Sequence, residues 1–237
     1  MRALRRLLVV VVVLLVLLAV ADRVGVGIVE DRVAEAIADR GDLAGTPDVS
    51  IEGWPFLTQV VAGNYSDVRI RLTAADLDQP EGTTADVRLR GVHVPLSDVI
   101  GGSVSTIPVD RIDGTVTLSY ALLSRKLGTD EVLEPEGDRL RVTKTVHVLG
   151  YDVPLTAVGT VRVADGKDGQ ELVIDVSDAG AAGVDLPGRV VDAASDLLDL
   201  RYPIRLPFGL RVTGIHPERA GVRITGAARD TVLDGHP

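Results

Sequence analysis

Four histidines and a row of aspartates are the side chains in this sequence that could hold a metal ion or move protons. The aspartates Asp192, Asp196 and Asp199 recur at helical spacing, which is typical of a solvated helix face, and no histidine or second carboxylate cluster is visibly paired with them. No two histidines have the HxH or HxxxH spacing of metal ligands. The pattern predicts no metal site. The four histidines are His93, His147, His216 and His236.

The sequence also lacks the residue patterns of nucleophilic catalysis. The chain has no cysteine, no G-x-S-x-G elbow, no Walker loop and no dinucleotide fingerprint. Ser103 lies in the loop sequence IGGSVS without an evident base. We therefore expect no catalytic residues and no cofactor, with a lipid-acting enzyme as the less favoured alternative. Lys144 lies in phase with the apolar side of a predicted strand, where it would either extend along the rim or contact a phosphate head group.

Composition describes an acidic body with an aliphatic core. Of the 237 residues, 46% are hydrophobic but only 3% are aromatic, so Val, Leu, Ile and Ala must fill the interior. The net charge is −9, and because the only charges within residues 1–21 are three arginines, the rest of the chain carries −12. Such a body is repelled by nucleic acid and by anionic lipid surfaces. Membrane contact beyond residue 21 would have to rely on apolar insertion.

The N-terminus resembles an export signal. Arg2, Arg5 and Arg6 precede an unbroken apolar run from Leu7 to Ala21, and positive charge before such a run is typical of a secretory signal or an anchor. As a helix the run is about 22 Å long, short of the roughly 30 Å of a bilayer core. Ala19-Val20-Ala21 fits a cleavage site. Both cleavage after Ala21 and retention as an anchor stay open, and either places the body outside the cytoplasmic membrane.

Periodicity in the body predicts an α+β fold with a curved, mostly antiparallel sheet. Apolar residues at helical spacing predict a helix from Val29 to Asp42, ended by Gly41. About eight later segments alternate apolar and polar residues, which is typical of strands with one solvated face. In one of them the alternation changes phase at Gly91, which predicts a bulge. A second amphipathic helix is predicted over Pro187 to Leu200, with an apolar face of Val190, Val191, Ala194, Leu197 and Leu198.

The aliphatic side of a sheet must be buried against another element, and two amphipathic helices would bury only a small part of it. One interpretation is a closed core of sheet and helix. The other is a groove partly filled by acyl chains, because smooth aliphatic walls with few rings suit a hydrocarbon ligand. Periodicity does not separate the two.

One stretch, IEGWPFLTQVVAGNYSDVRI over 51–70, places the only tryptophan and one of two phenylalanines on either side of a proline. With its Gly-aromatic-Pro-Phe-Leu-Thr-Gln and later Gly, it resembles the signature of the LmeA-like phospholipid-binding family of actinobacterial envelope proteins. The matching residues are Gly53, Trp54, Pro55, Phe56, Leu57, Thr58, Gln59 and Gly63. The resemblance implies a tubular lipid-binding type of fold, phospholipid binding in the envelope, a part in lipid or lipoglycan maintenance, and no catalytic residues.

Two roles are open for the paired rings. They would border a groove mouth or enter a membrane interface, or they would plug one end of the sheet, with a short helix over Thr58–Ala62. The suspected lipid contacts are Trp54, Phe56, Leu57, Val60, Val61, Val190, Ala194, Leu197 and Leu198, with Lys144 as the possible head-group contact.

We expect the following organisation and partners. Residues 1–21 form the signal or anchor, 22–42 the N-terminal helix, 43–230 the lipid-binding domain and 231–237 a tail. The partners are a phospholipid or related acyl lipid and the outer face of the cytoplasmic membrane, and not nucleic acid. A scaffold with a closed core that binds protein partners is the main alternative.

Overall fold

The computed structural model describes residues 2–101, 105–127, 131–148, 151–166, 169–181, 184–185, 201–204 and 209–234. The chain forms two compact units. The first comprises Met1–Arg71, Val87–Ile112 and Arg229–Pro237, and the second comprises Leu72–Asp86 and Asp113–Ala228. Each is described by itself.

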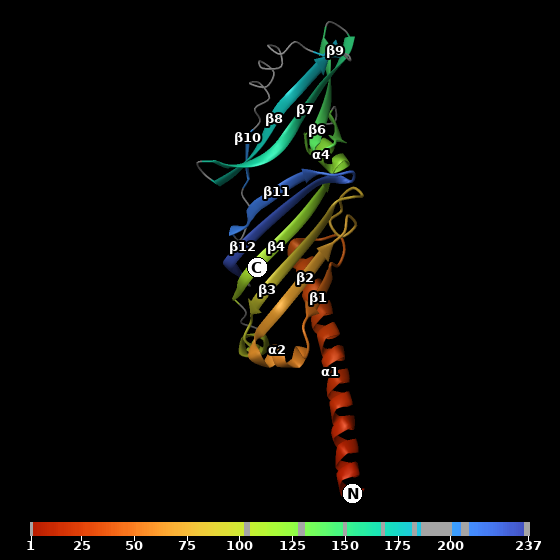
Figure 1. Ribbon diagram of the computed structural model, residues 1–237, viewed down its shortest axis with the longest axis vertical. Helices are drawn as coiled ribbons and strands as arrows, with labels where there is room; N and C mark the ends of the chain where they lie inside the picture. Colours follow the sequence, from red (N-terminus) through yellow and green to blue (C-terminus); the bar gives the residue numbers. More distant parts are fainter. Residues whose placement is uncertain are drawn as a thin grey trace. The chain divides into compact units, whose positions relative to one another are not determined.

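Helix α1 (Arg2–Gly41) is a single helix of 40 residues that ends at Gly41, as the sequence predicts. Its N-terminal half is exposed and apolar, whereas its C-terminal half packs on the first unit through Val26 and Ala34 (Figure 1). Helix α1 contains an 18-residue window with a mean hydropathy of 2.9. It is the one helix in the described part of the chain that is long and apolar enough to cross a membrane, and a signal sequence would have the same properties.

Strand β1 and most of β2 and β3 belong to the first unit, and the sheet in which they lie has the order β1-β2-β3-β4-β12-β11. The elements of this part are β1 (Asp48–Glu52), α2 (Phe56–Ala62), β2 (Asn64–Leu72), β3 (Thr84–His93), α3 (Leu96–Gly101) and β4 (Thr106–Ser119). Strands β1 and β2 are antiparallel, with Val49 opposite Ile70 and Ile51 opposite Val68. Val49, Ile51 and Val68 are buried, so this corner of the sheet carries an aliphatic core.

The predicted change of phase in β3 is confirmed. Leu89 and Val92 are both buried although three positions separate them, which regular alternation does not allow. Gly91 between them has a φ of +61°, in the region that glycine adopts without strain.

The second unit holds a five-stranded antiparallel sheet of order β10-β8-β7-β6-β5, with β9 paired to β8. Long strands dominate it, and β7 and β8 are paired as far as Gly166 and Gly169. The elements are α4 (Tyr120–Leu127), β5 (Glu131–Glu136), β6 (Arg139–Val148), β7 (Tyr151–Gly166), β8 (Gly169–Ala181), β9 (Val184–Asp185), β10 (Arg201–Ile204), β11 (Arg211–Pro217) and β12 (Gly221–Asp234).

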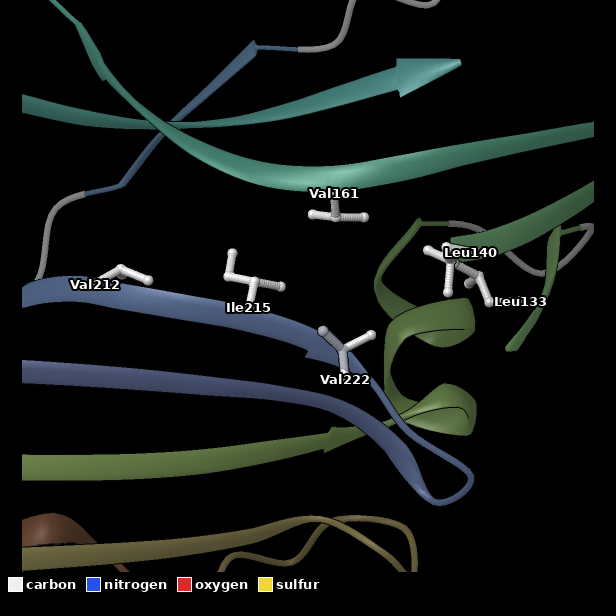
Figure 2. Close-up of a cluster of buried hydrophobic side chains, with 6 residues drawn as sticks. All are labelled: Leu133, Leu140, Val161, Val212, Ile215 and Val222. Carbon is white, nitrogen blue, oxygen red and sulfur yellow. The ribbon is translucent and has the colours of Figure 1, made fainter. Parts of the chain in front are cut away.

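A buried aliphatic cluster forms the core of the second unit. Figure 2 shows Val161 of β7 pointing toward Ile215 of β11, while Leu140 and Leu133 lie beside α4. Tyr120 and Leu123 of α4 pack against the cluster. Its members are Leu133, Leu140, Val161, Val212, Ile215 and Val222. Here the aliphatic sides of the strands meet one another, so this part is a closed core.

The predicted α+β class with mostly antiparallel strands is confirmed. The described residues form twelve strands in two open sheets, more than the eight that alternation reveals. Short strands such as β5, with the sequence EVLEPE, carry too few apolar residues to show a period of two. The helix predicted over residues 187–200 lies outside the described residues.

Candidate lipid-facing site

The sequence around the paired rings folds into a tight loop and a short helix. Gly53 has a φ of +110°, Pro55 occupies the N-cap of α2, and the helix covers the predicted 58–62 segment with two further residues at its start. Gly63 ends it in the left-handed conformation, and its N–H bonds back to the Val60 carbonyl at 3.2 Å. The carbonyl of Gly63 accepts a 2.9 Å hydrogen bond from the N–H of Val94, which ties the end of α2 to the segment after β3.

Gln59 connects α2 to the strands on both sides of it. Its Oε1 accepts a 2.9 Å hydrogen bond from the Ser66 N–H, and its Nε2 donates to the Glu52 carbonyl at 3.3 Å. One amide thus holds β1 and β2 to the same helix, while the Thr58 hydroxyl donates to the Pro55 carbonyl at 2.7 Å. The polar residues of the motif therefore have structural partners.

The two rings on either side of Pro55 have different surroundings. Phe56 is only 2% exposed, and its ring centroid lies 6.2 Å from that of Tyr65. Burial raises the pKa of the Tyr65 phenol. Trp54 is 68% exposed. Phe56 therefore belongs to the core, whereas Trp54 lies on the protein surface.

The outer side of α2 is also apolar. Val61 is 77% exposed, and Leu57 and Val60 are partly buried. Of the five lipid contacts suspected in this stretch, Trp54 and Val61 are thus the two with most surface free for a ligand or a bilayer.

Two carboxylates of α1 hold the helix to this corner, and neither stands out in the sequence. Asp22 is 2% exposed, and its Oδ1 accepts a 2.7 Å hydrogen bond from the N–H of Leu57 in the first turn of α2. Glu30 accepts a 2.7 Å hydrogen bond from the N–H of Ile51 in β1. Glu30 lies between the apolar positions of the predicted helix, and its carboxylate satisfies a backbone donor of β1.

Lys144 lies in a row of aliphatic positions in the second unit. It pairs with Leu155, and the neighbouring pairs on the same strands are Val142 with Ala157 and Val146 with Val153. Because directly opposed residues of antiparallel strands share a face of the sheet, the register places Lys144 in line with Val142, which packs against the buried cluster. The suspected contacts Val190, Ala194, Leu197 and Leu198 lie outside the described residues.

Other features offer little to a lipid or to catalysis. A hollow of about 370 Å³ after α1 is lined by short and acidic residues, including Asp39, Asp42 and Thr46. His93 pairs with Asp110 at 2.9 Å on the strand surface. In the part of the chain that the structure describes, no three His, Asp or Glu side chains are grouped to hold a metal ion.

Two open antiparallel sheets, aliphatic cores and an apolar N-terminal helix define an α+β protein suited to apolar contacts. A family model described as LmeA-like phospholipid-binding matches residues 20–227, and the chain therefore belongs to that family. Membership points to lipid binding rather than catalysis. Neither a search of curated proteins nor a search of solved structures gives a significant match.

Proposed function

We propose that this protein is an exported, non-catalytic phospholipid-binding protein of the cell envelope. It holds acyl chains against the aliphatic face of β6, β7 and β8, at the outer side of the cytoplasmic membrane, and serves the maintenance of envelope lipids or lipoglycans. Family membership supports the lipid class. The apolar helix behind three N-terminal arginines supports export.

The register of β6 and β7 supports the proposed position of the groove. The row that contains Leu140 and Val142 enters the buried cluster and continues along β6 with Val146 and Val148, opposite Val153 and Tyr151. The register thus continues the aliphatic sequence positions past the cluster, which supports a binding wall for a hydrocarbon chain along these strands. Lys144 occupies the register position between Val142 and Val146, and an ammonium group is a chemical partner for a lipid phosphate.

Native mass spectrometry of the full chain, released from detergent, tests the proposal. We expect bound phospholipid, with retention that rises with acyl length because each buried methylene contributes about 0.8 kcal/mol. Added salt is expected not to weaken binding, since the body is acidic and apolar burial dominates. A protein free of lipid after mild extraction, or a flat dependence on acyl length, would contradict the groove.

Lys144→Gln sharpens the test. If Lys144 contacts the head group, this variant loses anionic phospholipid in preference to phosphatidylcholine, whereas Lys126→Gln on α4 removes an equal charge elsewhere and keeps both. Equal loss of both lipids in the two variants would remove Lys144 from the site.

The buried cluster favours a second candidate function. It shows that part of the aliphatic surface closes on itself, as expected for a scaffold that binds protein partners. A lipid-free protein that captures other envelope proteins would support the scaffold.

A further inference from the structure

The apolar surface of α1 continues beyond the unbroken run that ends at Ala21. Val20, Val24 and Ile28 are 55%, 58% and 58% exposed, and they recur every four residues, so they form one stripe along the helix. From Leu7 to Ile28 the helix rises about 32 Å, which matches a bilayer core of roughly 30 Å. The run is short by itself, and the stripe supplies the missing length.

Charged residues in this region are arranged in a way that a membrane tolerates. Asp22 points into the protein and is almost fully buried, as its bond to α2 requires. Arg23 is exposed, and its long side chain can extend to the head groups. Exposed charges follow the stripe at Asp31 and Arg32, where the helix is in water.

Helix α2 lies at the level of this stripe. A Cβ atom built on Gly25 would lie 3.9 Å from the side chain of Leu57 and 4.0 Å from that of Phe56, so the first turn of α2 packs on α1 at Gly25. Figure 1 shows α2 beside α1, at the end of β2 and β3 that faces the free N-terminal part of α1. The exposed Trp54 and Val61 therefore lie near the place where α1 would leave a bilayer.

We propose that α1 is retained and spans the membrane, and that Trp54 and Val61 dock the first unit on the outer bilayer surface. The occupant of this apolar surface is the lipid interface, where tryptophan is favoured. Helix α2, which carries Val61, packs on a helix of membrane-spanning length, and the acidic charge of the body leaves apolar insertion as the means of contact.

Retention follows from the packing of Asp22. Cleavage after Ala21 would create a charged α-ammonium group on Asp22, a residue that is 2% exposed and whose carboxylate is hydrogen-bonded to α2. It would also remove Val20 from the stripe. We expect the protein in cell membranes to begin at Met1 or Arg2, and a mature N-terminus at Asp22 would overturn the proposal.

The fluorescence of Trp54, the only tryptophan, measures docking directly. The full chain is reconstituted in vesicles of phosphatidylcholine and phosphatidylglycerol, with or without phosphatidylcholine brominated on its acyl chains. We expect blue-shifted emission, quenching by the brominated lipid and protection from aqueous iodide. Emission that iodide quenches freely and brominated lipid does not would overturn the proposal.

Val61→Asp and Val232→Asp form a matched pair of variants. Both valines are exposed in the first unit, at 77% and 53%, so neither substitution disturbs the core. Val61→Asp is expected to lower quenching by brominated lipid about twofold or more, because a carboxylate is expelled from the interface, and Val232→Asp to leave it unchanged. Equal quenching in the two variants would show that α2 does not contact the bilayer.

The docking surface is independent of the groove on β6–β8. Native mass spectrometry of the unaltered chain tests the groove, and the bromolipid quenching of Val61→Asp tests docking. Loss of bromolipid quenching with phospholipid retained separates the two sites. Quenching in a protein that retains no phospholipid supports docking and contradicts the groove.

Discussion

The carboxylate of Asp22 and the backbone N–H of Leu57 form a 2.7 Å hydrogen bond across 35 positions of the chain. This bond joins α1 to the first turn of α2, and the side chain of Asp22 is almost fully buried. Asp22→Ala leaves the buried N–H without its acceptor, and we expect a loss of about 1–3 kcal/mol in unfolding free energy. Faster hydrogen exchange at the Leu57 amide would report the loss locally.

Asp31→Ala is the control, because Asp31 is an exposed acid on the same helix. We expect it to change stability by less than about 0.5 kcal/mol. Similar melting shifts for the two variants would mean that the Asp22 bond does not hold α2.

Alanine substitutions at Gly63 and Gly137 distinguish the cost of steric crowding from the cost of backbone strain. Their φ angles are +64° and +65°, so alanine carries the same left-handed strain at both, about 1–2 kcal/mol. A Cβ at Gly63 would lie 3.0 Å from the Pro95 Cα and the Val94 oxygen, whereas at Gly137 it meets nothing within 4 Å. Denaturant unfolding should show that Gly63→Ala lowers the unfolding free energy more than Gly137→Ala does. Equal losses of unfolding free energy would show that the Cβ at Gly63 is not crowded by Val94 and Pro95.

Ile215 tests whether the cluster in the second unit is a core or a ligand wall. Ile215→Ala removes buried methylenes that face Val161, and we expect a loss of about 2–5 kcal/mol with unchanged phospholipid retention. The exposed Val132→Ala is the control, with little effect on either. Reduced lipid retention at unchanged stability would place the groove here instead.

The β5–β6 hairpin carries a pair that responds to acid. Arg141 binds both carboxylate oxygens of Glu136, with Nε to Oε2 at 3.1 Å and a terminal nitrogen to Oε1 at 2.9 Å. These hydrogen bonds lower the pKa of Glu136. Because the folded-state pKa is the lower one, the pair stabilises the fold above about pH 4.3, the ordinary glutamate value, and the contribution is lost as the pH falls through the folded-state pKa.

Arg141→Gln should raise the pKa of Glu136 to its ordinary range, which a carbon-13 titration of the side-chain carboxyl measures. Arg223→Gln removes a similar charge that pairs with Glu218, and it should leave Glu136 unchanged. An unaltered Glu136 titration in Arg141→Gln would exclude Arg141 as the cause.

Local signals were sufficient for much of the fold. Gly41 ends α1, Gly91 marks the change of phase in β3, and Pro55 with Gly63 brackets α2. At Pro55, Gly63 and Gly91 the residue type itself favours the backbone conformation, so neighbouring sequence is enough to predict it. The α+β class followed from the same periodicities.

The arrangement of the candidate site depends on contacts that sequence spacing does not show. Trp54 and Phe56 are both aromatic residues beside Pro55, yet Trp54 is exposed, whereas Phe56 packs near Tyr65 and α1 in the core. Asp22 follows the apolar run and fits the position after a cleavage site, and its partner is 35 residues away. Glu30 lies between apolar positions of α1 without a visible partner in the sequence, and its partner is a strand amide.

The two carboxylates of α1 also have a mechanical consequence. Asp22 and Glu30 lie eight residues apart, about 12 Å along the helix axis, and they grip different elements, α2 and β1. Because α1 is hydrogen-bonded at two separate points, it cannot rotate or tilt relative to the sheet without straining one of the two hydrogen bonds. A change in the tilt of the N-terminal half of α1, such as a bilayer of changed thickness would cause, would therefore displace the β1–β2 edge of the sheet.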